Sequence, residues 1–210
     1  DSIHINGSPD LDIMKPEYLP SLEEAKKYYG INFDEYAIAM FHPVTTEIDQ
    51  MEVYAQNCVA ALLADRDDYL VVYPNNDLGS RLILKAYEAL KGNPRFRVIP
   101  SLRFEYFLTL LKNSQFIIGN SSAGIREAPY YGIPIINIGT RQQNRAVHAD
   151  ILHVDYQIEA IGAALDTIDI HKVNVGDSDF GQGNSAQLFL DCLQMTNFWQ
   201  MNQQKQFRDL

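Results

Sequence analysis

The sequence contains little cysteine and no long uninterrupted hydrophobic run. Its two cysteines, Cys58 and Cys192, lie far apart in helix-like patterns and match no metal-ligand spacing. We therefore expect two reduced thiols in the core of a cytoplasmic protein, with neither a metal nor another cofactor. No segment reaches the roughly 18 apolar residues that a membrane span requires, so we expect no membrane partner.

Basic residues are also scarce relative to acidic ones. The 210 residues include 17 Lys and Arg against 27 Asp and Glu, which gives a formal net charge of −10. This charge repels polyanions and argues against nonspecific nucleic-acid or membrane binding, whereas a small anionic ligand fits if a few arginines gather at its site. The length and the 46% hydrophobic content fit one large domain or two small ones. The chain starts with Asp rather than Met, and we expect a processed product or an excised fragment.

From Tyr36 onward, short apolar runs alternate with helix-like patterns. Most of the runs are apolar throughout, which is typical of strands covered on both faces. We expect strands at 37–41, 69–73, 96–99, 116–118, 133–138 and 151–154, with helices between and after them at 47–64, 78–90, 104–112, 124–131 and 158–168. Two further helices are expected at 21–30, with a Ser21 N-cap, and at about 185–193. This alternation predicts an α/β fold with a doubly wound parallel sheet.

The segment Phe116-Ile-Ile-Gly-Asn-Ser-Ser-Ala-Gly-Ile-Arg-Glu127 carries the strongest functional signal. A buried strand ends at Gly119, a small polar turn follows, and a helix is expected to open near Gly124. Free backbone N–H groups, the hydroxyls of Ser121 and Ser122 and the positive end of the helix dipole would meet there, which suits a phosphate. The pattern is neither a dinucleotide glycine fingerprint nor a Walker loop. Many such turns are plain N-caps, so both interpretations stay open at this point.

Polar side chains also follow the other expected strands. His42 comes directly after the first strand, Asn75 and Asp77 follow the second, and Arg141 follows the fifth. The carboxyl ends of parallel strands meet at one edge of a sheet, and ligands of such sheets bind in the crevice there. The topology therefore predicts that these turns form one site.

Each candidate residue also has a purely structural interpretation. His42 is suited to donate to a phosphate or transfer a proton, or only to bond a neighbouring turn. Asp77 fits an N-cap more readily than a ligand contact. Arg126 faces either solvent or the ligand. Glu127 suits the first turn of a helix whatever the function, but two vicinal hydroxyls such as those of a ribose would also satisfy its carboxylate.

Together these turns resemble the C-terminal half of UDP-N-acetylglucosamine 2-epimerases, especially the hydrolysing type that makes N-acetylmannosamine for sialic acid synthesis. The matching pieces keep the family's order over nearly the whole chain: Gly7-Ser8-Pro9, Phe41-His42-Pro43, Tyr73-Pro-Asn-Asn-Asp77, Ile118-Gly-Asn-Ser-Ser-Ala-Gly-Ile-Arg-Glu127, Gly132-Ile-Pro-Ile-Ile-Asn-Ile-Gly-Thr-Arg-Gln142 and Gly181-Gln-Gly-Asn184. The Gly-Asn-Ser-Ser block joined to Gly-Thr-Arg-Gln is the most specific of them.

The resemblance implies a GT-B architecture, in which two Rossmann-like domains face each other and UDP binds mostly to the C-terminal one. On this basis Ser121 and Ser122 would hold the diphosphate, and Glu127 the ribose hydroxyls. The remaining residues carried over are His42 as a catalytic residue and, as residues of the UDP or UDP-N-acetylglucosamine site, Asn75, Asp77, Ile99 near the uracil, Arg126 and Arg141.

The resemblance also divides the chain and leaves part of the enzyme out. It implies an interdomain segment at 1–20, a UDP-binding domain at 21–183, and a C-terminal helix and tail at 184–210 that pack toward a missing N-terminal domain. The family's acid–base carboxylates come mainly from that missing domain, so we expect this chain alone to bind UDP with little turnover. A homo-oligomer is expected for the full-length protein. Two alternatives remain: the C-terminal domain of a UDP-sugar GT-B glycosyltransferase, and a non-catalytic nucleotide-binding or assembly module.

Overall fold

The computed structural model describes residues 3–143, 145, 151–168 and 180–200. Within the chain, contacts group the residues into two compact units, one formed by 19–178 and the other by 1–18 together with 179–210. Residues 201–210 of the C-terminal helix and tail expected at 184–210 lie outside the described residues.

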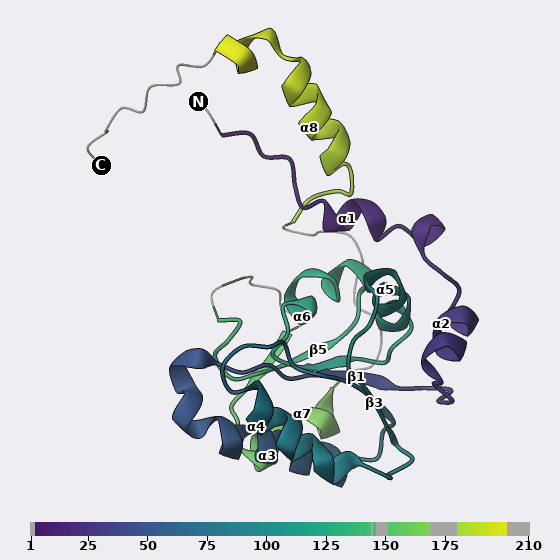
Figure 1. The fold of residues 1–210 in the computed structure, drawn as a ribbon, viewed down its shortest axis with the longest axis vertical. Helices are drawn as coiled ribbons and strands as arrows, with labels where there is room; N and C mark the ends of the chain where they lie inside the picture. The colour runs from purple at the N-terminus through teal and green to yellow at the C-terminus, as the bar shows by residue number, and fades with distance from the viewer. Residues whose placement is uncertain (1–2, 144, 146–150, 169–179, 201–210) are drawn as a thin grey trace. The chain divides into compact units, whose positions relative to one another are not determined.

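The larger unit contains a six-stranded sheet with the strand order β3-β2-β1-β4-β5-β6, and every neighbouring pair is parallel. The predicted doubly wound parallel sheet is confirmed, and Figure 1 shows it running through the middle of this unit. The strands are β1 (Ala37–Met40), β2 (Tyr69–Val72), β3 (Phe96–Ile99), β4 (Ile117–Gly119), β5 (Ile135–Ile138) and β6 (Ile151–Val154). The strand order reverses between β1 and β4, and the crevice of such a sheet lies at this reversal.

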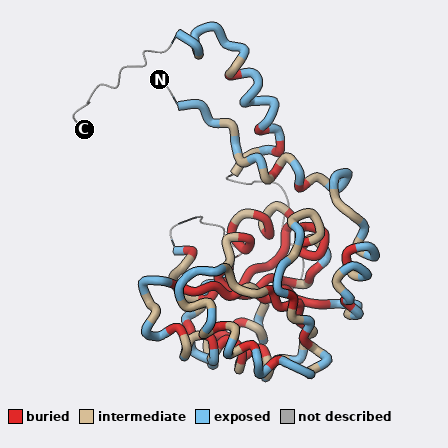
Figure 2. Tube along the Cα trace, in the orientation of Figure 1, coloured by how far each residue is buried: buried red, intermediate tan, exposed pale blue. Residues whose placement is uncertain are grey.

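Burial explains why these short runs form strands. Every residue of the inner strands β2, β4 and β5 is buried, as expected for strands covered on both faces. The edge strands expose polar side chains, with Arg97 exposed in β3 and His153 in β6. Figure 2 shows the buried residues concentrated along the sheet and on the helix faces turned toward it.

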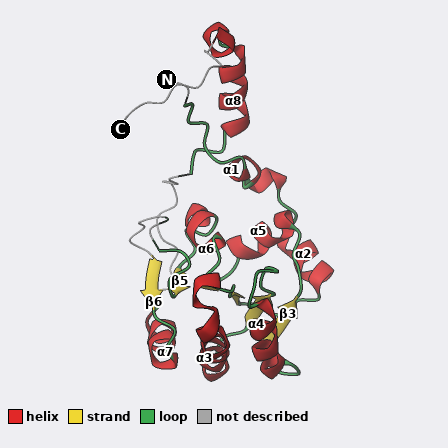
Figure 3. Cartoon of the chain, turned by 60° about the vertical axis from the view of Figure 1, so that its left-hand side comes forward, coloured by secondary structure: helices red, strands yellow, loops and turns green. Residues whose placement is uncertain are grey.

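Helices cover both faces of the sheet, as Figures 1 and 3 show. One layer holds α3 (Met51–Ala64), which contacts both α4 (Ser80–Tyr87) and α7 (Ile158–Thr167). The other layer holds α5 (Phe104–Lys112) and the short α6 (Ala123–Arg126), with α2 (Leu22–Tyr29) packed on α5. A 3₁₀ turn, η3 (Glu88–Leu90), extends α4.

Two predicted helices differ from the observed ones. The helix expected at 47–64 starts only at Met51, because Glu47 in the preceding 3₁₀ segment η2 (Thr45–Gln50) has a φ of −122° and a ψ of 26°. The helix expected at 124–131 is broken into α6 and the 3₁₀ turn η4 (Pro129–Tyr131). Pro129 has no N–H to donate and its ring crowds the preceding turn, so a continuous helix cannot pass through it.

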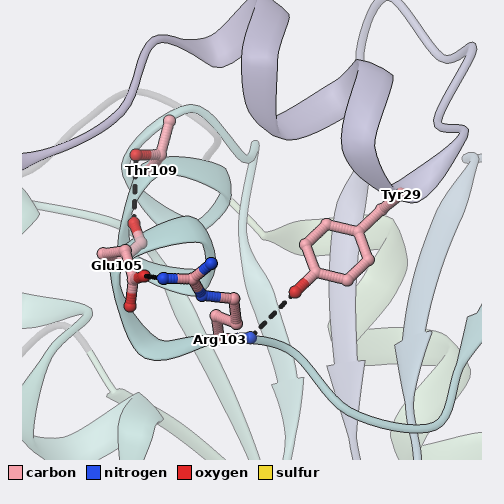
Figure 4. A network of polar contacts seen from close by, with 4 residues as sticks. All are labelled: Tyr29, Arg103, Glu105 and Thr109. Atoms are coloured by element: carbon pink, nitrogen blue, oxygen red, sulfur yellow. Dashed lines mark hydrogen bonds and ion pairs between the residues drawn. The ribbon is translucent and has the colours of Figure 1, made fainter.

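Figure 4 shows how the start of α5 is fastened to α2. The hydroxyl of Tyr29 accepts a 2.9 Å hydrogen bond from the Arg103 N–H, and the Arg103 guanidinium forms a 2.6 Å ion pair with Glu105. The Thr109 hydroxyl donates to the backbone carbonyl of Glu105 at 3.1 Å. The N-cap predicted at Ser21 is confirmed and is part of a capping box, because the Ser21 and Glu24 side chains each bond the other residue's backbone N–H. The bond between Tyr29 and Arg103 therefore links the end of α2 to the residue before α5.

The smaller unit joins the two ends of the chain. It contains α1 (Asp10–Ile13), η1 (Pro16–Tyr18), α8 (Ser185–Gln194) and η5 (Thr196–Gln200). The Asp12 carboxylate accepts hydrogen bonds from the backbone N–H groups of Ser185 and Ala186, both at 2.8 Å, and from the Ser185 hydroxyl at 3.0 Å. A carboxylate at this position satisfies free N–H groups at the start of α8, although it comes from the opposite end of the sequence.

Both cysteines are buried, and neither forms a disulfide. Cys58 lies on α3 against the sheet, where burial raises the pKa of its thiol to about 12. Cys192 lies on α8 in the smaller unit. Among the described residues, no helix combines the length and the hydrophobicity needed to cross a bilayer.

Candidate functional site

A cavity of about 410 Å³ lies at the carboxyl edge of the sheet. The segments that follow β1, β2, β3 and β4 all contribute to its lining, as the parallel topology predicts. The lining residues named here come from the ends of β1, β2 and β3, from α5 and from the turn between β4 and α6: Met40, His42, Val72, Tyr73, Pro74, Asn75, Pro100, Ser101, Leu102, Phe104, Phe107, Ser122, Ala123 and Glu127. The lining thus combines polar residues from the turns after β1, β2 and β4 with apolar residues from the segment after β3.

The end of β4 approaches β1 so closely that only glycine fits. Gly119 has a φ of 133°, and a Cβ atom on it would lie 2.0 Å from the carbonyl oxygen of Met40. This approach brings the next residue, Asn120, against the turn after β1. The Asn120 N–H donates to the Met40 carbonyl oxygen at 3.0 Å. A side chain at 119 would therefore separate the two strands at the point where the sheet reverses.

Asn120 is fully buried and holds the backbone of His42 from both sides. Its Oδ1 accepts from the His42 N–H at 2.6 Å, and its Nδ2 donates to the His42 carbonyl oxygen at 2.8 Å. Its own backbone carbonyl accepts from Arg141 Nη1 at 3.0 Å and from Gln142 Nε2 at 2.8 Å. One residue therefore links the turns after β1, β4 and β5. The sequence pattern did not single out Asn120, although its place between a buried strand and a serine turn was a usable signal.

His42 is 9% exposed and lines the cavity. Its Nδ1 accepts a 3.0 Å hydrogen bond from the Asn75 N–H, so the neutral ring carries its proton on Nε2. Burial and, to a smaller extent, the charge of Arg141 lower the pKa of His42 from 6.5 to about 4, with Asp77 partly opposing both effects. At neutral pH the ring is therefore an uncharged hydrogen-bond donor.

Arg141 lies outside the cavity lining given above, close enough for its charge to act on His42. Burial lowers the pKa of Arg141, the nearby Arg145 lowers it further, and Asp77 opposes the shift. Arginine nevertheless stays charged at neutral pH. Asp77 itself is exposed, accepts a short hydrogen bond from Asn75 Nδ2, and does not cap a helix, since Gly79 is the N-cap of α4.

The two serines of the polar turn lie in different surroundings. Ser122 lines the cavity, whereas the Ser121 hydroxyl accepts a 3.3 Å hydrogen bond from the Ala123 N–H. Ser122 is the N-cap of α6 but forms no side-chain capping bond in the structure. The helix after it has only four residues, so its dipole is much weaker than the sequence pattern predicts.

The remaining predicted site residues lie around the same edge. Glu127 is buried and lines the cavity, while Arg126 beside it is half-buried and is not among the lining residues given above. Ile99 is buried at the end of β3, immediately before the lining residues Pro100 and Ser101. The apolar lining residues Leu102, Phe104 and Phe107 were not predicted as site residues, because apolar residues at the start of a helix have the same pattern as ordinary core residues.

The buried acceptor atoms Asn75 Oδ1 and Gln142 Oε1 receive no hydrogen bond from the described part of the chain. Buried polar atoms are usually paired, and a ligand is one way to pair them. Both belong to the turns that surround His42. The described residues include no group of three or more His, Cys, Asp or Glu side chains arranged to hold a metal ion.

The strand order, the helices on both faces and the cavity at the point of reversal define a Rossmann-like domain of the kind that forms one half of a GT-B protein. The family model described as UDP-N-acetylglucosamine 2-epimerase matches residues 1–194. The chain belongs to this family.

Individual relatives agree with this assignment. The chain is 46% identical over 212 residues to a UDP-N-acetylglucosamine 2-epimerase of Neisseria meningitidis serogroup B, an alignment that covers 99% of this chain and 56% of the relative. It is 28% identical over 183 residues to the UDP-N,N'-diacetylbacillosamine 2-epimerase (hydrolyzing) of Legionella pneumophila, covering 86% of this chain and 48% of the relative. The chain thus spans about half the length of the curated relatives it matches.

The fold also matches solved structures. The crystal structure of the Methanocaldococcus jannaschii UDP-GlcNAc 2-epimerase in complex with UDP-GlcNAc and UDP superposes with a TM-score of 0.68 at 20% identity. The match covers 89% of this chain and 53% of that one. At this level of identity the likeness establishes the shared fold.

Replacing Asn120 with Ala should lower the free energy of unfolding by about 2–4 kcal/mol, because it leaves the buried N–H and carbonyl of His42 without their side-chain partners. Urea denaturation measures this loss. The matched control is Asn113→Ala, which removes only a bond from Nδ2 to the Thr109 carbonyl and should cost about 1 kcal/mol or less. Equal losses in the two variants would show that Asn120 has no special structural role.

Replacing His42 with Asn should reduce the dependence of stability on pH. The unfolded chain binds a proton at His42 below about pH 6.5, whereas the folded protein does so only near pH 4, so the wild-type free energy of unfolding falls as the pH drops through this window. The contribution is at most about 3 kcal/mol, and the variant lacks it while it keeps an acceptor for the Asn75 N–H. Urea denaturation of both proteins at pH 7 and pH 4.5 measures the difference, and parallel pH profiles would contradict the assignment.

Proposed function

We propose that this chain is the UDP-binding half of a hydrolysing UDP-N-acetylglucosamine 2-epimerase, acting in sialic acid or related nonulosonate synthesis. The family assignment supports an epimerase, and one relative, from Legionella, carries the hydrolysing type in its name. The observation that carries the proposal is the cavity at the strand reversal, where the uncharged His42 ring lies within the field of Arg141. A neutral donor beside a cation suits a ligand that bears a diphosphate.

In the proposed complex, the diphosphate lies between the turn after β4 and the turn after β1. Ser121 and Ser122 offer hydroxyl and backbone groups, His42 offers Nε2–H, and Arg141 supplies positive charge. Arg126, on α6 beside this turn, adds a second cation near the diphosphate. Asn75 and Asp77 bound the same edge of the site.

The nucleoside fits the opposite side of the cavity. Glu127 is buried in its lining and accepts from the two ribose hydroxyls in this proposal. The uracil lies beside Ile99 and the segment after it, where Leu102 and Phe104 form an apolar wall for a flat ring. In this arrangement the uracil contacts the apolar part of the lining, and the ribose contacts the carboxylate of Glu127.

The proposed reaction has two steps, elimination of UDP across C1–C2 of the sugar and addition of water to the resulting glycal to give N-acetylmannosamine. As the C1–O bond breaks, negative charge grows on the departing diphosphate. His42 stabilises this charge by donating Nε2–H to a phosphate oxygen, and Arg141 stabilises it through its fixed positive charge. Donors that are already in place need no reorganisation during the step, which is the main advantage of the rigid links through Asn120.

Acid–base chemistry at C2 of the sugar needs carboxylates that this half does not supply. Among the residues named in the cavity lining, Glu127 is the one carboxylate, and the proposal assigns it to the ribose. The missing groups then come from the absent N-terminal half, which the length of the relatives accommodates. This chain alone therefore binds UDP and turns over little substrate.

The same reasoning assigns the parts of the chain. Residues 21–183 form the UDP-binding domain, residues 1–20 connect it to the absent half, and residues 184–210 pack toward that half. In support, α8 and η5 expose large apolar side chains, including Phe189 at 53% and Trp199 at 68%. Exposed apolar surface of this kind marks a place where another domain packs. We also propose that the full-length protein forms a homo-oligomer.

Replacing Ser121 and Ser122 together with Ala should weaken the binding of UDP about tenfold, since two polar groups near the diphosphate are lost. Isothermal titration calorimetry of the 210-residue chain measures the affinity. The control is Ser114→Ala, which removes a buried hydroxyl bonded to the Leu111 carbonyl at the far end of α5 and should leave UDP affinity unchanged. Unchanged affinity in the double serine variant would refute the proposed diphosphate position.

The chain alone should form N-acetylmannosamine at least about a hundredfold more slowly than the full-length protein, because general acid–base catalysis supplies a factor of that order. Incubation with UDP-N-acetylglucosamine, with and without the separately produced missing half, measures free sugar by chromatography. Rapid N-acetylmannosamine formation by the chain alone would overturn the assignment of the carboxylates. Transfer of sugar to an acceptor would point to a glycosyltransferase, and UDP binding without restored turnover to a nucleotide-binding module.

A further inference from the structure

Three side chains, none of them in the cavity lining given above, form a polar network. Glu47 lies in η2, five residues after His42, and its Oε1 accepts a 2.5 Å hydrogen bond from the hydroxyl of Thr140. Its Oε2 accepts a 2.9 Å bond from the hydroxyl of Tyr156, and that hydroxyl accepts a 3.2 Å bond from the Thr140 N–H. The three residues come from the segments after β1, β5 and β6, so the network joins three strand ends.

Tyr156 is held rigidly at the centre of this network. Its ring is 7% exposed, stacks on Tyr54 of α3 with ring centroids 3.6 Å apart, and meets Phe41 edge-on. Its backbone carbonyl accepts from Asn57 Nδ2 at 3.0 Å. Gly139 leaves room for the ring, because a Cβ atom there would lie 2.0 Å from Tyr156 Cζ. The hydroxyl therefore has one defined position, and a polar network with a fixed centre imposes geometry on its members.

The network fixes the backbone next to Arg141, and Asn120 binds the Arg141 side chain. Thr140, the residue before Arg141, is fixed by Tyr156 and Glu47 through both its N–H and its hydroxyl. The Arg141 guanidinium donates to the carbonyl of Asn120, which also holds His42. Glu47 belongs to the same turn region as His42, so the network connects the segments of both residues a second time.

We propose that Tyr156, together with Glu47 and Thr140, positions the Arg141 guanidinium relative to the His42 ring. Tyr156 does not touch the ligand, and its contribution is to hold the two donors at the spacing that a diphosphate requires. The identity of the ligand rests on the proposed function, whereas the geometric role of Tyr156 can be tested without a ligand. Loosening the network leaves the fold intact and lets Arg141 sample other orientations, so binding weakens because orientation has to be restored on binding.

Tyr156→Phe in the 210-residue chain tests the proposal, because it removes the hydroxyl and keeps the stacked ring. The variant should bind UDP about five- to tenfold more weakly by calorimetry. It should also shift and broaden the Arg141 Nε–H and His42 ring signals in NMR spectra of the ligand-free protein. Thr140→Val, which removes the hydroxyl that bonds Glu47, should produce both effects. Thr140→Ser, which keeps this hydroxyl, should behave like the wild type.

The matched control is Tyr69→Phe. Tyr69 is also buried and also donates its hydroxyl to a carboxylate, that of Asp65 at 2.5 Å, but it begins β2 at the amino edge of the sheet. Its loss should lower stability and leave UDP affinity and the Arg141 signal unchanged. If Tyr156→Phe behaves like Tyr69→Phe, the positioning role is refuted. If the wild-type chain does not bind UDP, the proposed function fails, and the ligand-free Arg141 and His42 signals still decide the role of Tyr156.

Discussion

The site depends on the hydrogen bonds of one buried side chain, that of Asn120. Its amide holds the backbone of His42, and its carbonyl receives the side chains of Arg141 and Gln142. Gly119 makes these bonds possible because only a residue without Cβ lets β4 come so close to β1. The turn after β4 therefore organises the two turns beside it, in addition to whatever it contributes to a ligand.

Much of the fold could be predicted from local patterns. Six short apolar runs indicated a parallel sheet, and the parallel topology then placed their polar ends on one edge. The role of Asn120 could not be predicted in the same way, because its partner His42 lies 78 residues away. Glu47 fitted a helical pattern, but its backbone is not helical and its carboxylate bonds Thr140 and Tyr156, which lie about a hundred residues away in the sequence. The end of α6 could have been predicted from Pro129, because proline has no N–H to continue a helix.

The net charge of the chain does not reflect the charge at the candidate site. The chain carries a formal net charge of −10, yet Arg126 and Arg141 lie at the carboxyl edge of the sheet, and the field of Arg141 reaches His42. Burial and this field keep His42 uncharged, so the edge offers fixed cations and a neutral donor side by side. An acidic surface with a local concentration of donors repels polyanions in general and still accommodates a small phosphate-bearing ligand.

The close fit between Gly139 and Tyr156 has an evolutionary consequence. A side chain at 139 would occupy the space of the tyrosine ring, so position 139 cannot gain a side chain while Tyr156 is present. Relatives that carry a larger residue at 139 must carry a smaller one at 156, and they must hold the segment that contains Arg141 by other bonds. These two positions should therefore vary as a pair across the family, and the pairs would separate members that share the present arrangement from members that have replaced it.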